Sequence, residues 1–192
     1  ALKLAPDNPY VVFEYANYFQ ATSEFVEAEK HYKKVYELLP DDEKVLLMCG
    51  LNQMKLGNSD KAKEFLEKVL KINPKSHTAL YNISQIAYTG KNFELAKEYL
   101  TDAYAINADI ETTNLLALTY MELNDYHNAK VLLNKLNNEI PNNTGILTTL
   151  AKAEMLDMND NIMPSVYLCT CSDDGLLYQI LNRIAHISLA LL

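Results

Sequence analysis

Four histidines are the residues of this chain whose chemistry best suits acid–base catalysis. They are His31, His77, His127 and His186, and they are scattered along the sequence. None has a carboxylate or a nucleophilic side chain at the spacing of a catalytic motif. We therefore expect no catalytic residues and no enzymatic activity.

Two short segments contain metal-ligand residue types. The segment "CTC" carries Cys169 and Cys171, but no second ligand pair follows at the spacing of a zinc site. The segment "DMNDN" starts at Asp157 like a calcium-binding loop, yet it has Ile162 where glycine is required and no glutamate at the twelfth position. Phosphate-binding and dinucleotide-binding motifs are missing as well. The sequence predicts no metal site and no cofactor.

The overall charge argues against a nucleic-acid partner. The 192 residues include 17 Lys and Arg against 25 Asp and Glu, which gives a formal net charge of −8. Each phosphate contact needs a basic side chain, so an acidic chain is a poor candidate for binding RNA or DNA. The three cysteines, Cys49, Cys169 and Cys171, are odd in number and lack the spacing of a disulfide framework. This favours a reducing compartment, and we expect a cytoplasmic protein.

A repeat of about 34 residues organises the sequence, and a period of this length indicates one supersecondary unit per repeat. Prolines that follow apolar runs stand at Pro6, Pro40, Pro74 and Pro141, and Ala108 stands at the intervening position. Alanines recur with the same period at Ala28, Ala62, Ala96 and Ala129, and small residues recur at Ala16, Gly50, Ser84, Ala117 and Ala151. A single skipped residue near position 108 accounts for the one irregularity. Small residues at a fixed period are typical of places where two helices cross closely.

Each period has the pattern of two helices. Residues 9–21 and 25–38 carry apolar residues at the spacing of one helical face, with a short polar turn between them. Asp and Asn side chains in "PDNP", "PDDE" and "PNNT" precede the first helix of a pair, where they can cap the free backbone N–H groups. The proline after each second helix ends it. The chain is thus expected to be all-α and built of antiparallel helix pairs.

These features resemble the tetratricopeptide repeat (TPR) family. The family pattern of Leu-Gly, Tyr, Ala-x3-Phe and Pro is matched by "LLMCG", "DKAKEFL" and Pro74 in one repeat, and by "LLALTY", "YHNAKVLL" and Pro141 in another. The leading tryptophan of the family is replaced by Val12, Leu46, Leu80 and Thr113. Pentatricopeptide repeats have nearly the same length and bind RNA, but the alanine–aromatic–proline columns and the acidic charge favour the TPR family.

The resemblance implies a right-handed superhelical solenoid of helix pairs. Residues 1–8 match the end of a preceding repeat, so we expect a chain cut from a longer array. Four repeats follow at 9–42, 43–76, 77–109 and 110–143, and residues 144–163 form a partial fifth repeat whose first helix is expected at 144–157. Residues 164–192 do not follow the repeat.

TPR arrays hold a peptide or a partner helix on the concave surface lined by the first helix of each pair. Carried over to this chain, the resemblance implies a peptide-binding groove lined by Phe13, Asn17, Leu47, Met48, Leu51, Tyr81, Asn82, Gln85, Tyr88 and Leu118. The family's two-carboxylate clamp needs Lys, Asn, Asn, Lys and Arg on three successive helices. In the two registers that begin at the first and second repeats, only Asn17 or only Asn82 fits, so docking of chaperone C-termini is not expected.

The groove residues are largely apolar, and two interpretations follow. An exposed apolar patch of this kind indicates an interaction site, and its methionines suit adaptable binding of a helix. Alternatively, the same side chains pack against their own neighbouring helices. The leading hypothesis is a non-catalytic protein–protein interaction scaffold with a protein or peptide ligand. The alternative is a regulatory or substrate-docking TPR region excised from a larger enzyme such as a glycosyltransferase.

The segment "GLLYQILNRIAHISLALL" at 175–192 has Arg183 as its only full charge. Its polar residues form one narrow stripe, which disfavours a membrane span. A solenoid needs its apolar ends covered, so we expect a helix at 176–191 that caps the array against Leu147, Leu150 and Leu156. The rival expectation is that this helix occupies an apolar groove of its own chain or of a second copy, which would give self-association.

Overall fold

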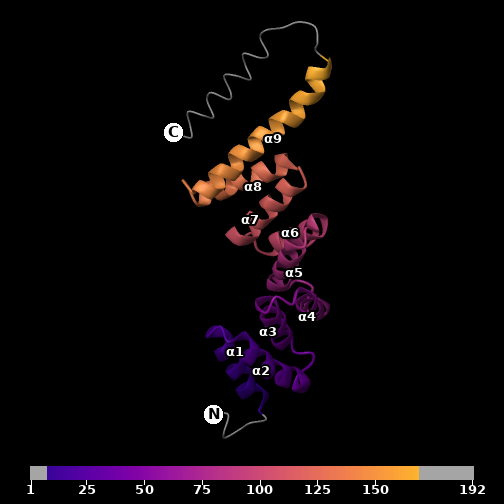
Figure 1. The fold of residues 1–192 in the computed structure, drawn as a ribbon, viewed down its shortest axis with the longest axis vertical. Helices are drawn as coiled ribbons and strands as arrows, with labels where there is room; N and C mark the ends of the chain where they lie inside the picture. Colours follow the sequence, from indigo (N-terminus) through magenta and orange to yellow (C-terminus); the bar gives the residue numbers. More distant parts are fainter. Residues whose placement is uncertain (1–7, 169–192) are drawn as a thin grey trace. The chain divides into compact units, whose positions relative to one another are not determined.

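The computed structural model describes residues 8–168, with side chains described as far as Met158. This part of the chain contains nine helices and no strand (Figure 1). The helices are α1 (Pro9–Ala21), α2 (Phe25–Leu38), α3 (Glu43–Lys55), α4 (Ser59–Ile72), α5 (His77–Thr89), α6 (Phe93–Ile106), α7 (Ile110–Glu122), α8 (Tyr126–Glu139) and α9 (Thr144–Leu168). The all-α solenoid of helix pairs expected from the sequence is confirmed.

A side-chain cap starts α1, α3 and α9, whereas Ser76 before α5 makes no such bond. The Asn8 side-chain oxygen accepts a hydrogen bond from the backbone N–H of Tyr10 at 3.0 Å, with proline at the first helical position. Asp42 accepts from the N–H of Val45 at 2.9 Å. Asn143 accepts from the N–H of Ile146 at 3.1 Å. These bonds satisfy donors that the helix itself leaves free, so the polar residues around the prolines have the capping role expected of them.

The turn inside each helix pair has one residue in the left-handed backbone region. It is Ser23 (φ 63°), Gly57 (φ 77°), Lys91 (φ 60°) or Asn124 (φ 59°). These positions keep the spacing of the repeat, including its one shorter interval. A left-handed residue reverses the chain within a few residues after the first helix, so this backbone feature sets where the second helix begins.

The described chain divides into two compact units within α7, between Thr119 and Tyr120. In the first unit, each helix from α1 to α6 packs against the next. The alanines Ala28, Ala62 and Ala96 of the second helices are fully buried. On Gly50 of α3, a Cβ atom would lie 3.0 Å from Cγ of Leu66. Small residues therefore allow the two helices of a pair to approach closely, as the repeat pattern predicts.

In the second unit, α8 packs against α9. Ala129 of α8 and Ala153 of α9 are fully buried, and so is Leu133. Lys130 forms an ion pair with Asp157 that joins the two helices. The same use of alanine at the helix contact thus continues in this unit.

Helix α9 is longer than the sequence predicted. We expected a helix at 144–157, whereas α9 continues to Leu168 and includes Pro164. One full repeat after Asn124, the position of the left-handed turn residue is taken by Met158. The left-handed region favours residues such as Gly57 and Asn124, although Lys91 also adopts it, and Met158 is helical. The chain continues as a helix where the other repeats turn.

Residues 1–7 and 169–192 lie outside the described part of the chain. The expected end of a preceding repeat and the expected capping helix at 176–191 fall there, together with Cys169 and Cys171. Among the helices described, none is both long and apolar enough to span a membrane.

Candidate functional site

The residues predicted to line the groove lie on the first helices of successive pairs within the first unit. They fall into three repeat columns and one further residue: Phe13, Leu47 and Tyr81; Met48 and Asn82; Asn17, Leu51, Gln85 and Leu118; and Tyr88. Because residues of one column occupy the same place on successive helices, a column describes one line across α1, α3, α5 and α7. Each of the ten side chains except Phe13 is partly exposed.

Phe13 belongs to the core rather than to an exposed patch. It is only 7% exposed and lies edge-to-face with Tyr32 of α2, at 6.0 Å between ring centroids. The Lys44 ammonium lies over its ring at 5.5 Å. Its place in the groove lining is corrected accordingly, because α2 and α3 cover most of the phenyl ring.

The apolar side chains of α3 are shared between surface and core. Met48 packs against the core cluster of the first repeat, and Leu47 packs against that of the second. Leu51 is also half-buried. These residues pack on neighbouring helices, as the second interpretation expected, and each still presents some apolar surface.

Two amide side chains of the predicted groove have one end engaged within the protein. The side-chain oxygen of Asn17 accepts a hydrogen bond from the Tyr32 hydroxyl at 2.7 Å. The side-chain nitrogen of Asn82 donates to the carbonyl of Thr78 at 2.7 Å. Asn17 can therefore offer its N–H groups to a ligand, and Asn82 can offer its oxygen. Gln85, one turn after Asn82, adds a third amide.

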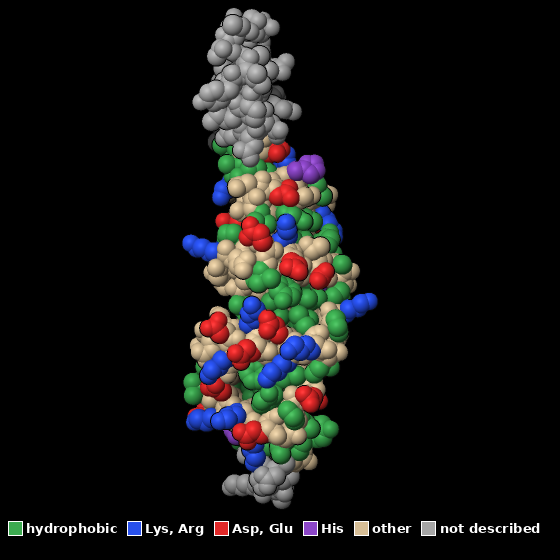
Figure 2. All heavy atoms as spheres, turned by 90° about the vertical axis from the view of Figure 1, so that its right-hand side faces the viewer, with side chains coloured by type: hydrophobic (Ala, Val, Ile, Leu, Met, Phe, Trp, Pro, Cys, Tyr) green, Lys and Arg blue, Asp and Glu red, His purple; other side chains and the backbone are tan. Residues whose placement is uncertain are grey.

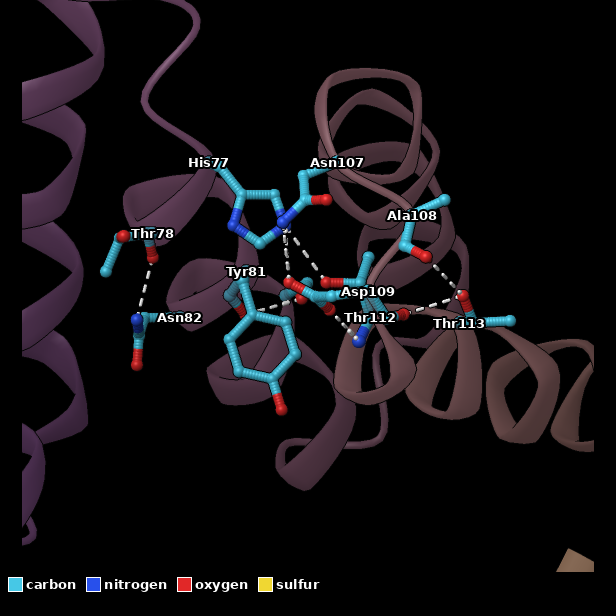
Figure 3. Close-up of polar contacts among 10 residues, drawn as sticks. His77, Thr78, Tyr81, Asn82, Asn107, Ala108, Asp109, Thr112 and Thr113 are labelled. Atoms are coloured by element: carbon cyan, nitrogen blue, oxygen red, sulfur yellow. Dashed lines mark hydrogen bonds and ion pairs between the residues drawn. The ribbon is translucent and has the colours of Figure 1, made fainter. Parts of the chain in front are cut away.

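A cluster of polar side chains joins the starts of α5 and α7 beside this line (Figure 3). Nε2 of His77 lies 3.0 Å from the Thr112 hydroxyl and 3.5 Å from the Asp109 carboxylate. Asp109 also accepts from the backbone N–H of Thr112 at 2.8 Å and from the Asn107 amide at 3.1 Å. The Tyr81 ring stacks on His77, at 6.4 Å between centroids.

The geometry of this cluster indicates a structural role and not a catalytic one. In a nucleophile–histidine–carboxylate triad, the two partners contact opposite nitrogens of the imidazole. Here Thr112 and Asp109 share Nε2, and Thr112 is fully buried. Burial would raise the pKa of Asp109, but the backbone and hydroxyl hydrogen bonds from Thr112 and the nearby His77 outweigh it and lower the pKa of this carboxyl. The charged Asp109 caps α7 and ties it to α5.

No motif in the sequence indicates the His77–Asp109 contact. The two residues belong to different repeats, so only the stacking of consecutive repeats brings them together. A signal could be found in the repeat itself, because Asp109 precedes α7 at the place where Asp42 precedes α3 and His77 starts α5.

Charged side chains of both signs lie on the surface of the described chain. The face in Figure 2 has Lys and Arg side chains interspersed with Asp and Glu, without a continuous basic stripe on that face. Within the described residues, no three His, Cys, Asp or Glu side chains gather in an arrangement that could hold a metal ion. Burial raises the pKa of the Cys49 thiol to about 12, so this cysteine is neutral and a poor nucleophile.

The fold is similar to that of solved TPR proteins. MamA aligns with 21% identity and a TM-score of 0.72 over 78% of this chain and 82% of that chain. MamA from Desulfovibrio magneticus RS-1, residues 41 to the end, aligns with 18% identity and a TM-score of 0.71 over 85% of this chain and 97% of that one. YrrB, described as a TPR protein with an unusual peptide-binding site, aligns with 16% identity and a TM-score of 0.73 over 82% of each chain.

Family comparisons identify the repeats directly. No curated protein sequence matches the chain. The family model described as YpiA-like, C-terminal tetratricopeptide repeats matches residues 9–76, and the tetratricopeptide repeat model matches residues 77–110 and 111–143. Together they span the helix pairs α1–α2, α3–α4, α5–α6 and α7–α8. The chain therefore belongs to the tetratricopeptide repeat family.

Proposed function

We propose that this protein is a non-catalytic interaction scaffold that binds an extended peptide or a partner helix along the first helices of its repeats. The TPR fold supports an interaction scaffold in general, and the solved relative YrrB is described as having a peptide-binding site. The observation that carries the finer proposal is the column Asn17, Leu51, Gln85 and Leu118, whose four side chains are all partly exposed.

This column alternates amide and leucine side chains along one line. An extended peptide has backbone N–H and C=O groups that an amide can bond, since an amide both donates and accepts. Leucines between the amides offer apolar contact to the peptide side chains. Alternation of the two thus suits a ligand that is held by its backbone and selected by its side chains.

The compartment proposed for this function is the cytoplasm. An odd number of cysteines, with Cys49 a free thiol in the core, suits a reducing environment, where structural disulfides are rare.

The test combines peptide selection with a groove variant. Peptides selected on the full chain from a random library would be measured by fluorescence anisotropy against the wild type and against Leu51→Asp with Leu118→Asp. We expect the double variant to weaken binding at least 100-fold, because a few central residues carry most of the affinity in such interfaces. Circular dichroism should show unchanged helicity, because both leucines are only half-buried.

A matched control introduces the same charges elsewhere. Val26 and Val131 are 59% and 57% exposed on α2 and α8, so Val26→Asp with Val131→Asp adds two carboxylates to second helices. This variant should bind the selected peptides like the wild type. Equal loss in the control, or full binding by the groove variant, would place the peptide site elsewhere.

A further inference from the structure

A second candidate site lies on the other side of α3. The helices α2, α3 and α4 line a half-open cavity of about 510 Å3, a size typical of ligand sites. Cys49, Asn52 and Gln53 of α3 line it. At about 100° per helical residue, Leu51 points away from Cys49 and Gln53. The cavity residues Cys49 and Gln53 and the Leu51 column of the proposed groove therefore use different faces of α3, and neither proposal depends on the other.

The floor of the cavity contains a buried hydrogen-bond acceptor that lacks a partner. Asn52 is 1% exposed, and its Nδ2 donates to the backbone carbonyl of Phe25 at 3.0 Å. That carbonyl fixes the orientation of the amide, because the other orientation would set two oxygens against each other. The remaining atom, Oδ1, has no hydrogen-bond partner among the described residues. A buried polar atom left in this way needs an explanation.

The neighbouring amide shows that the floor is otherwise well bonded. The Gln53 side chain donates to the Glu29 carboxylate at 2.9 Å and accepts from the Asn58 amide at 2.9 Å. Both ends of Gln53 are thus engaged within the protein. Asn52, which also lines the cavity, keeps Oδ1 as a buried acceptor without a partner.

The walls of the cavity are aromatic. Tyr36 of α2 and Phe65 of α4 lie edge-to-face with 5.3 Å between centroids. The Lys68 ammonium lies over both rings, at 5.2 and 5.4 Å, and donates to the Tyr36 hydroxyl at 2.8 Å. Held in this way, the two rings form a fixed apolar surface that suits an apolar side chain.

The remaining lining is rich in lysine, although the protein as a whole carries a net charge of −8. Lys30, Lys33 and Lys61 line the cavity with Glu29 as the acidic residue. Glu29 is engaged by Gln53, and Lys30 is paired with Glu27 at 2.6 Å. Lys33 and Lys61 have no ion-pair partner in the described part of the chain. Two ammonium groups are therefore available to an anionic ligand.

The next repeat provides an internal comparison. Where α2, α3 and α4 have Lys33, Asn52, Gln53 and Lys61, the equivalent positions one repeat later have Glu67, Ile86, Ala87 and Leu95. The same stacking of helices is thus built without the amide floor and without the lysines. Gln53 is accounted for by its bonds within the protein, whereas the packing of the repeats does not explain the unpaired Oδ1 of Asn52 or the two lysines.

We propose that this cavity binds an acidic peptide segment. One apolar side chain of the segment lies against Tyr36 and Phe65. A backbone N–H of the segment donates to Asn52 Oδ1. Flanking carboxylates pair with the ammonium groups of Lys33 and Lys61.

The probes are capped pentapeptides titrated into the 15N-labelled full chain and followed by NMR. The peptide Asp-Asp-Phe-Asp-Asp should shift the side-chain amide signals of Asn52 and Gln53. Replacing its Phe by Ala, or its four Asp by Lys, should weaken binding at least tenfold. A ten-nucleotide oligouridylate tests for a site that binds any polyanion. If it binds at the cavity as tightly as the Phe peptide, the proposal is overturned.

Variants copy the next repeat into the cavity. Two variants should each weaken binding of the Phe peptide at least tenfold with unchanged helicity: Asn52→Ile alone, and Lys33→Glu with Lys61→Leu. Both lysines are exposed, so the second variant tests the proposal even if the first folds poorly. The control Lys71→Glu with Lys75→Leu makes the same change of charge at exposed positions outside the cavity lining and should bind normally. Unchanged binding by the lysine variant, or shifts confined to the groove residues, would overturn the proposal.

Discussion

Two successive junctions of the solenoid share a frame and differ in their polar residues. At the α2–α3–α4 junction the buried positions are Ala28 and Tyr32, and at the α4–α5–α6 junction they are Ala62 and Leu66; all four are at most 2% exposed. Next to this frame, Asn52 of the first junction stands where the second has Ile86. The close helix crossings require the buried positions of the frame to be conserved in kind between the two junctions. The position of Asn52 and Ile86, beside the frame, is free to differ.

A second contrast separates the two polar clusters of the first unit. In the cluster at α5 and α7, Asp109, Thr112 and His77 bond one another. In the cavity between α2 and α4, Asn52 keeps one atom unpaired. A polar cluster whose donors and acceptors bond one another stabilises the fold. We assign the one that leaves a buried acceptor beside a cavity to a ligand, as proposed above.

The largest expected effect tests the shared frame. Leu66 on α4 and Leu100 on α6 occupy one repeat column, each on the last helix of its junction, and both are fully buried. Leu66→Ala and Leu100→Ala should each lower the free energy of unfolding by about 2–5 kcal/mol, through lost burial and the cavity left behind. Urea denaturation followed by circular dichroism measures both. If Leu66→Ala cost less than about 1 kcal/mol while Leu100→Ala cost the expected amount, the two junctions would not share a frame.

The next largest effect is expected from exchanging Asn52 and Ile86, which differ between the two junctions. Ile86 packs partly buried against the second core cluster, so Ile86→Asn should lower the free energy of unfolding by about 1–3 kcal/mol because it buries an amide without partners. Asn52→Ile removes an unpaired acceptor and adds apolar contact, so it should raise the free energy of unfolding by about 1 kcal/mol.

The outcome of this exchange distinguishes two roles for Asn52. If Asn52→Ile were instead destabilising by more than about 1 kcal/mol, the bond from Asn52 to the Phe25 carbonyl would be its main contribution. The amide would then be structural, as in the cluster at α5 and α7. Thermal unfolding of both variants beside the wild type gives the sign directly.

The smallest expected effect concerns the polar cluster at the starts of α5 and α7. Asp109→Ala should cost about 1 kcal/mol at pH 7, as expected for the loss of a helix N-cap. Because the pKa of Asp109 is lowered in the folded protein, its stabilisation is present above the unfolded pKa of about 4 and is lost as the pH falls through the folded value. The stability difference between wild type and variant should therefore shrink below about pH 4.

A neighbouring acidic residue serves as the control for this prediction. Asp102 is exposed on α6, so Asp102→Ala should change the free energy of unfolding at pH 7 by less than about 0.5 kcal/mol. A difference between wild type and Asp109→Ala that stayed constant down to pH 2 would show that the Asp109 carboxylate is not held charged by Thr112 and His77.

Much of the fold could be predicted because its determinants are local. The helices expected at 9–21 and 25–38 have those bounds in α1 and α2. The caps and prolines act within a turn of the residues they influence. The prediction failed at α9, where Met158 takes the place of a turn residue and the helix continues to Leu168.

The candidate sites were less predictable because burial depends on residues far apart in the sequence. Phe13 was expected in an exposed patch, but Tyr32 and Lys44 cover it. The other groove residues stay a prediction that the peptide experiment tests. Asn52 belongs to no motif, although its column has Ile86 in the next repeat. Comparing columns between repeats, rather than looking for motifs, would have found it.

The sequence by itself determined the family, the period and the helix pairs of this protein. A helix forms from contacts within four residues, and small residues at a fixed period indicate where helices cross closely. Only the tertiary structure decided which side chains remain available to a ligand. Cavity and cluster are each built from residues of different repeats, as with Asn52 beside Phe25 or His77 beside Asp109. Their exposure and pairing arise when neighbouring repeats pack, because burial is a property of the assembled surface and not of any one helix.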